Sequence, residues 1–163
     1  MLRWIGRGAL LGLLVGLMTA GGYIVAFSFG FMALAWGAAL AGLPNRPADS
    51  AMLTLIAPAA GGLMLLCGGL LGLPPGAALG AIFGAVIGAA VGLGRRWLSP
   101  ATAAALGAVI TTALVALLHL WLLATDPDPT LREYIFLTII PGLLAICAGG
   151  FVGWRLMAGE QKP

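Results

Sequence analysis

Long stretches without a charged side chain constrain this chain more than any other feature of its sequence. They lie between the following pairs of residues: Arg7 and Arg46, Asp49 and Arg95, Arg96 and Asp126, and Glu133 and Arg155. Each stretch is longer than the roughly 18–20 apolar residues that cross the hydrocarbon core of a bilayer. The sequence therefore predicts an all-α, polytopic integral membrane protein.

The composition supports this prediction and indicates which kinds of partner to expect. Of 163 residues, 61% are hydrophobic and only 8% are charged, whereas about a quarter of a soluble domain is charged. A chain of this size cannot hide so much apolar surface in a water-soluble core. The arginines sit at the ends of apolar blocks, so the net charge of +3 indicates membrane orientation rather than nucleic-acid binding. We expect the lipid bilayer as a partner and no nucleic acid.

Proline and charge mark the expected breaks between helices. The breaks fall at residues 44–47, 74–75, 95–100 and 126–129, and they leave apolar blocks at about 8–43, 51–73, 76–94, 101–124 and 133–154. Ser99 before Pro100 is typical of an N-cap followed by proline in the first turn. Thr130 with Glu133 three residues later is typical of a capping box.

The first block is too long for one perpendicular crossing. As a single helix it would measure about 54 Å, against a hydrocarbon core of about 30 Å. It is either one long kinked helix, which gives five spans, or a hairpin that turns near Gly21-Gly22-Tyr23, which gives six. Arg3 and Arg7 before an apolar run resemble a signal peptide, but the apolar run continues to Leu43. We therefore expect an uncleaved first helix.

The positive-inside rule favours six spans. With six, one side of the membrane receives nearly all the basic residues: Arg3, Arg7, Arg46, Arg95, Arg96, Arg155 and Lys162. Only Arg132 falls on the other side, beside Asp126, Asp128 and Glu133. We expect a bacterial-type inner (plasma) membrane, with both termini cytoplasmic.

The third and sixth spans resemble each other. Residues 53–58 read LTLIAP and precede Cys67, and residues 137–141 read LTIIP and precede Cys147. Within one membrane domain of residues 1–163, this predicts two repeat halves, 1–74 and 75–163. Three spans per half would make the repeat inverted, an arrangement that recurs in transporters. Chains rich in Ala, Leu, Gly and Ile also resemble themselves by chance, which is the alternative.

Glycine recurs at every fourth position in two spans. The helix-packing glycines are Gly8, Gly12 and Gly16 in one span and Gly76, Gly80, Gly84, Gly88 and Gly92 in the other. Residues four apart share one helix face, so these positions form grooves that another helix can approach closely. The pattern does not say whether that helix belongs to the same chain. Gly84→Leu is expected to disrupt the contact.

Two prolines are candidate hinges. Pro58 and Pro141 lie inside apolar blocks, where each would remove a backbone hydrogen bond and bend its helix. One interpretation is a packing bend, and the other is a hinge that lines a solute path.

The sequence offers little site chemistry. No Asp, Glu, Lys or Arg lies at mid-membrane depth, which weighs against a proton- or cation-coupled carrier. Nothing predicts a catalytic residue, a metal site or a cofactor of the chain's own, so we do not expect an enzyme. His119 is interpreted as an interfacial hydrogen-bonding residue, and Cys67 and Cys147 as small buried apolar residues without a disulfide. The alternative for these three residues is a cofactor contact shared with a partner.

Two functions remain open. The first is a non-catalytic multi-pass subunit that packs against partner subunits of a larger membrane complex through its glycine faces. The second is a small neutral-solute channel or transporter built on the inverted repeat.

Overall fold

The structure is a computed structural model that describes residues 1–41, 47–125 and 139–159. These residues form four helices, α1 (Leu2–Leu40), α2 (Pro47–Gly94), α3 (Pro100–Thr125) and α5 (Ile140–Ala158). All four are long and apolar enough to be membrane spans. The protein is therefore an all-α, multi-pass integral membrane protein, as its composition predicts.

The first apolar block is one helix. α1 has 39 residues and continues through Gly21, Gly22 and Tyr23, so the turn expected there is not formed. Glycine permits a turn but does not enforce one. A turn inside an apolar segment would also leave backbone groups without hydrogen bonds, which a continuous helix avoids. The alternative of a long first helix describes α1 correctly.

The second expected break is also absent. α2 has 48 residues and contains Pro58, Pro74 and Pro75 in its interior. Each proline removes one N–H from the helix, a loss that membrane helices tolerate when neighbouring groups compensate. Consequently, the structure shows four candidate spans rather than six within the described residues.

The start of α3 was predicted correctly from its polar residues. The backbone N–H of Thr102 donates to Ser99 Oγ at 3.2 Å, and the N–H of Ser99 donates to Thr102 Oγ1 at 2.7 Å. This reciprocal cap confirms Ser99 as the N-cap before Pro100. The capping box expected at Thr130 and Glu133 lies outside the described residues.

Pro141 lies near the start of α5 as the structure describes this helix. Its first residue is Ile140, so Pro141 lies in the first turn, where a missing N–H costs little. Pro141 was expected inside a span, as a packing bend or a hinge. The residues before Ile139 lie outside the described part of the chain, so this expectation stays a prediction.

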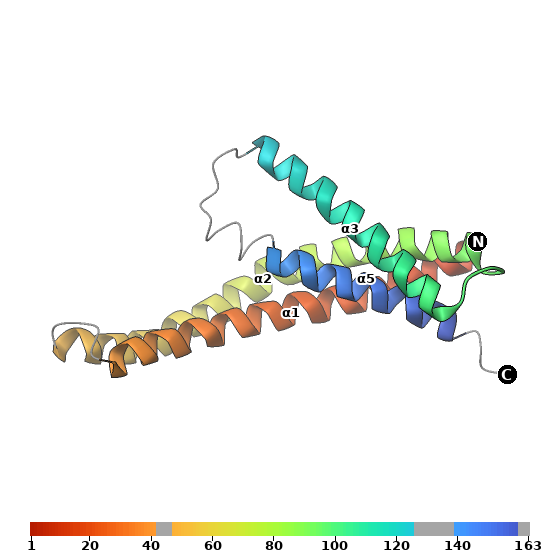
Figure 1. The fold of residues 1–163 in the computed structure, drawn as a ribbon. Helices are drawn as coiled ribbons and strands as arrows, with labels where there is room; N and C mark the ends of the chain where they lie inside the picture. The colour runs from red at the N-terminus through yellow and green to blue at the C-terminus, as the bar shows by residue number, and fades with distance from the viewer. Residues whose placement is uncertain (42–46, 126–138, 160–163) are drawn as a thin grey trace. The chain divides into compact units, whose positions relative to one another are not determined.

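The chain divides into two compact units. Unit 1 comprises Met1–Thr19 and Gly76–Pro163, and unit 2 comprises Ala20–Pro75. In unit 1 the first half of α1 lies antiparallel to the second half of α2, and α3 packs against α5 (Figure 1). In unit 2 the remaining halves of α1 and α2 form an antiparallel hairpin.

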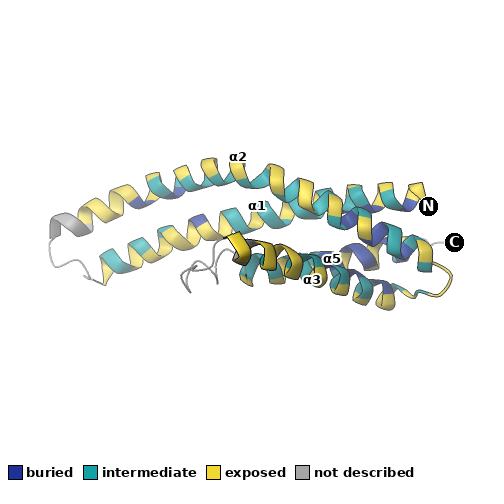
Figure 2. Ribbon diagram, turned by 90° about the horizontal axis from the view of Figure 1, so that it is seen from above, coloured by how far each residue is buried: buried dark blue, intermediate teal, exposed yellow. Residues whose placement is uncertain are grey.

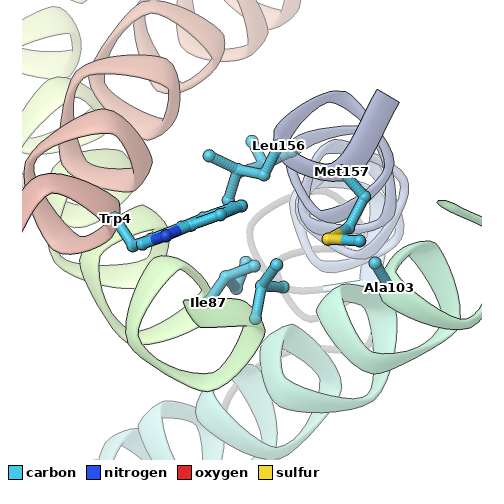
Figure 3. Packing of buried hydrophobic residues seen from close by; sticks show 7 residues of the cluster. Trp4, Ile87, Ala103, Leu156 and Met157 are labelled. Carbon is cyan, nitrogen blue, oxygen red and sulfur yellow. The ribbon is translucent and has the colours of Figure 1, made fainter. Parts of the chain in front are cut away.

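Unit 1 holds the main apolar core. Figure 3 shows the Trp4 indole of α1 between α2 and α5, with Met157 turned toward Ala103. The full cluster consists of Trp4, Ile87, Val91, Ala103, Val152, Leu156 and Met157. Most other described positions are exposed or half-buried (Figure 2), as expected where lipid takes the place of protein around each helix.

Candidate functional site

The glycine faces of α1 and α2 lie against each other. A Cβ placed on Gly12 would meet the carbonyl oxygen of Gly80 and lie 2.8 Å from Gly84 Cα. A Cβ on Gly8 would meet Gly84 O and lie 2.8 Å from Gly88 Cα. No real Cβ fits at such distances, so the two backbones touch only because both helices carry glycine there.

The contact extends along several turns of both helices. Gly16 lies against Gly76, and at the other end Gly88 and Gly92 lie against Trp4. A Cβ on Gly92 would be 2.9 Å from Trp4 Cβ. The eight glycines singled out in the sequence therefore face other parts of the same chain.

A second close-packed interface joins α3 to α5. A Cβ on Gly107 would meet Gly149 O, and a Cβ on Gly153 would meet Ala103 O. Gly149 itself faces the side chain of Thr111, which is buried and donates to Gly107 O at 2.9 Å. This interface was not predicted from the sequence. Its signal was the spacing of four between Ala103, Gly107 and Thr111 and between Gly149 and Gly153.

The hairpin of unit 2 packs differently. Side chains of α1 cover glycines of α2: Met32 lies over Gly61, and Ile24 lies over Gly68 and Gly72. Other glycines of this hairpin have nothing within 4 Å of an added Cβ: Gly22, Gly30, Gly37, Gly62 and Gly69. Unit 2 thus keeps glycine positions that the described part of its own chain leaves open.

Pro58 has a specific consequence in unit 2. Because proline lacks an N–H, the carbonyl of Thr54, four residues earlier in α2, loses its helical donor. The indole Nε1–H of Trp36 in α1 donates to this carbonyl oxygen at 3.4 Å. The bond is long, but it is supplied by the neighbouring helix at the acceptor that the proline releases.

Most hydroxyl groups within the helices bond back to their own backbone. Thr19 donates to Val15 O at 2.8 Å, and Thr112 donates to Ala108 O at 2.8 Å. Ser28 differs, because it is 1% exposed and its Oγ has no hydrogen-bond partner among the described residues. Ser28 and Thr111 are the buried polar residues among those described.

The candidate cofactor residues are spread out. Cys67 lies in unit 2, whereas His119 and Cys147 lie in unit 1. Within unit 1, Thr111 of α3 neighbours Gly149, which is two residues after Cys147 in α5. His119 lies eight residues beyond Thr111, so the two are about 12 Å apart along the axis of α3. The described residues hold no group of three metal-ligating side chains.

The expected burial of the two cysteines is wrong. Cys67 and Cys147 are free and exposed. Glycines and alanines, rather than cysteines, form the closest backbone contacts of unit 1, because close backbone approach requires smaller residues than cysteine.

Comparison with known proteins gives no match: no family model, no curated protein and no solved structure is similar to this chain.

Proposed function

We propose that this protein is a non-catalytic, multi-pass subunit that binds transmembrane helices of another polypeptide in a larger membrane complex. The observation that carries the proposal is the set of open glycines in unit 2. Gly22, Gly30 and Gly37 lie on α1, and none has a heavy atom within 4 Å of an added Cβ. In lipid, helices associate through close packing at small residues, so these positions favour an incoming helix.

The contrast between the units refines the first hypothesis. The eight helix-packing glycines of α1 and α2 in unit 1 lie against the chain itself, so they serve folding under this proposal and not partner binding. The partner contact is assigned to unit 2, whose hairpin also exposes large apolar side chains such as Leu34 and Leu70, each 76% exposed.

Copurification tests the proposal. The tagged full chain, extracted in mild detergent, is expected to retain at least one other membrane polypeptide by mass spectrometry. Gly30→Leu fills open space and should release that polypeptide while the protein remains inserted. Recovery of the chain alone as a symmetric particle, unchanged by Gly30→Leu, would contradict the proposal.

A second candidate function is a facilitator for a small neutral solute. It is favoured by an internal correspondence: Ser28 and Thr111, the two buried hydroxyls among the described residues, are 83 positions apart, as are Pro58 and Pro141. In unit 2 Met32 packs over Gly61, and in unit 1 Val115 packs over Gly142. A shift of 83 positions takes Met32 to Val115 and takes Gly61 to within two residues of Gly142. The two contacts therefore correspond, which supports the inverted repeat that transporters use.

Solute entry distinguishes this candidate from the first. Proteoliposomes containing the chain alone would take up glycerol or urea faster than protein-free vesicles in stopped-flow light scattering. Ser28→Ala would change that rate if the buried hydroxyl lines the path. Equal rates with and without protein would exclude the facilitator.

We also propose six crossing segments with both termini cytoplasmic. A straight helix of 39 residues is about 58 Å long, and fitting it across about 30 Å of hydrocarbon would need a tilt of roughly 60°, beyond the usual 0–40°. The boundary between the units, at Thr19/Ala20 and Pro75/Gly76, lies beside both breaks expected from the sequence. Six crossings need the chain to reverse direction at both places, where α1 and α2 are continuous in this structure, and each half would then have about one bilayer length.

A further inference from the structure

We propose that the end of unit 1 where the chain starts binds the headgroups of anionic phospholipids through a rim of five arginines. The rim consists of Arg3, Arg7, Arg95, Arg96 and Arg155. The inference goes beyond the proposed function, because it assigns a lipid class to a defined surface and holds whether or not another polypeptide binds unit 2.

The fold brings these arginines together from three separate parts of the sequence. Arg3 and Arg7 flank Trp4, and Arg155 precedes Leu156; both Trp4 and Leu156 belong to the buried cluster of unit 1. Arg95 and Arg96 follow Val91 of the same cluster by about one turn. Every arginine of the rim is therefore within five residues, along the sequence, of a member of one buried cluster.

A short turn holds the middle of the rim in place. The N–H groups of Trp97 and Leu98 donate to Gly94 O at 2.8 and 3.1 Å. Leu98 packs against the core cluster, whereas Trp97 is 89% exposed. The turn thus presents Arg95, Arg96 and the Trp97 indole outward together.

No acidic side chain balances the positive charge of the rim in the described part of unit 1. All five arginine side chains are exposed, and the described residues of this unit include no Asp or Glu. Guanidinium groups bind phosphate oxygens through paired N–H donors. A phosphate-bearing ligand would supply the negative charge that the described residues of this unit do not.

The exposed apolar side chains beside the rim indicate that the phosphate belongs to a lipid. Trp97 and Trp154, which is 42% exposed, lie at the same end as the arginines, and tryptophan favours the headgroup level of a bilayer. Directly behind them the helices expose leucine, such as Leu93 at 71%. A phospholipid with a net negative headgroup satisfies both surfaces at once.

Lipid retention tests the inference. The full chain is incubated in mixed micelles of phosphatidylglycerol and phosphatidylcholine, and bound lipids are counted by native mass spectrometry. The wild type is expected to enrich phosphatidylglycerol over the bulk ratio. Because one arginine near an anionic surface changes binding about fivefold, Arg95→Gln with Arg96→Gln should reduce the enrichment about 25-fold.

Matched variants keep the test decisive if that double variant inserts poorly. Arg155→Gln alone should reduce the enrichment about fivefold, and Arg95→Lys with Arg96→Lys should preserve most of it. Arg132→Gln removes one arginine from the opposite side of the membrane in the six-span proposal, where the sequence also has Asp126, Asp128 and Glu133, and it should leave the enrichment unchanged. The inference is overturned by retention in the bulk ratio, by an equal loss in Arg132→Gln, or by inorganic phosphate displacing the lipid, which would indicate a general anion site.

Discussion

At Gly12 a hydrogen atom occupies the place where any other residue would put a methyl group against the Gly80 carbonyl. The sequence identified these glycines but not how little room they have. Alanine is already too large at this interface, although leucine was the expected disruptive substitution. The positions were predictable because their spacing is regular. Their partners were not, because spacing on one helix says nothing about which helix lies opposite.

Gly12→Ala is expected to destabilise the protein by about 1–3 kcal/mol, because the added Cβ forces two backbones apart. Gly22→Ala, in the same helix but with nothing within 4 Å, should be neutral or stabilising by up to about 1 kcal/mol. Thermal unfolding in one detergent compares the two variants. Equal stability would show that α1 and α2 do not touch at Gly12.

A double-mutant cycle tests the bond between Trp36 and the Thr54 carbonyl. Trp36→Phe should cost about 0.6 kcal/mol beyond its packing loss, a typical value for an interhelical hydrogen bond in a membrane protein. In a Pro58→Ala background this term should vanish, because the backbone N–H restored by the substitution then bonds to the Thr54 carbonyl within α2. The unfolding free energies of four proteins give the coupling. Additive effects would mean that the indole does not compensate for the proline.

At the scale of the helix, the sequence predicted boundaries where polar side chains make them. Ser99 and Thr102 cap each other at the start of α3, and their pattern was readable because a cap is a local interaction. Glycine and proline were weaker signals. Gly21 and Gly22 lie inside α1, and Pro74 and Pro75 lie inside α2, because an apolar environment favours continuous backbone hydrogen bonding.

The α3–α5 contact can be tested with two neighbouring glycines. Gly153→Ala would place a Cβ against the Ala103 carbonyl, whereas Gly150→Ala would lie at ordinary contact distance, 3.5 Å from Ala104 O. The first change should destabilise by about 1–3 kcal/mol and the second should not. Unfolding in mixed detergent micelles measures both. If Gly150→Ala proved the more damaging, the register of the two helices would be wrong.

At the scale of the whole molecule, the central question is how many times the chain crosses the bilayer. In a background with Cys67→Ala and Cys147→Ala, single cysteines at Leu2, Asn45 and Trp97 report the side of each position. Six spans predict that an impermeant maleimide reaches all three from the same side. An opposite response at Asn45 would mean that α1 crosses once, and the six-span proposal would fail.

The sequence alone determined that lipid surrounds this protein, that its fold is all-α, and which glycine positions permit close packing. The length of a charge-free segment and the spacing of its glycines are local properties of the chain, so they can be read without the fold. The tertiary structure decided the rest. It showed that the glycine faces of α1 and α2 contact each other, that α3 and α5 share a second small-residue interface, and that both cysteines are exposed. Those outcomes depend on which helices meet and in what register. In a chain whose helices are all apolar, no local pattern distinguishes the face that meets protein from the face that meets lipid.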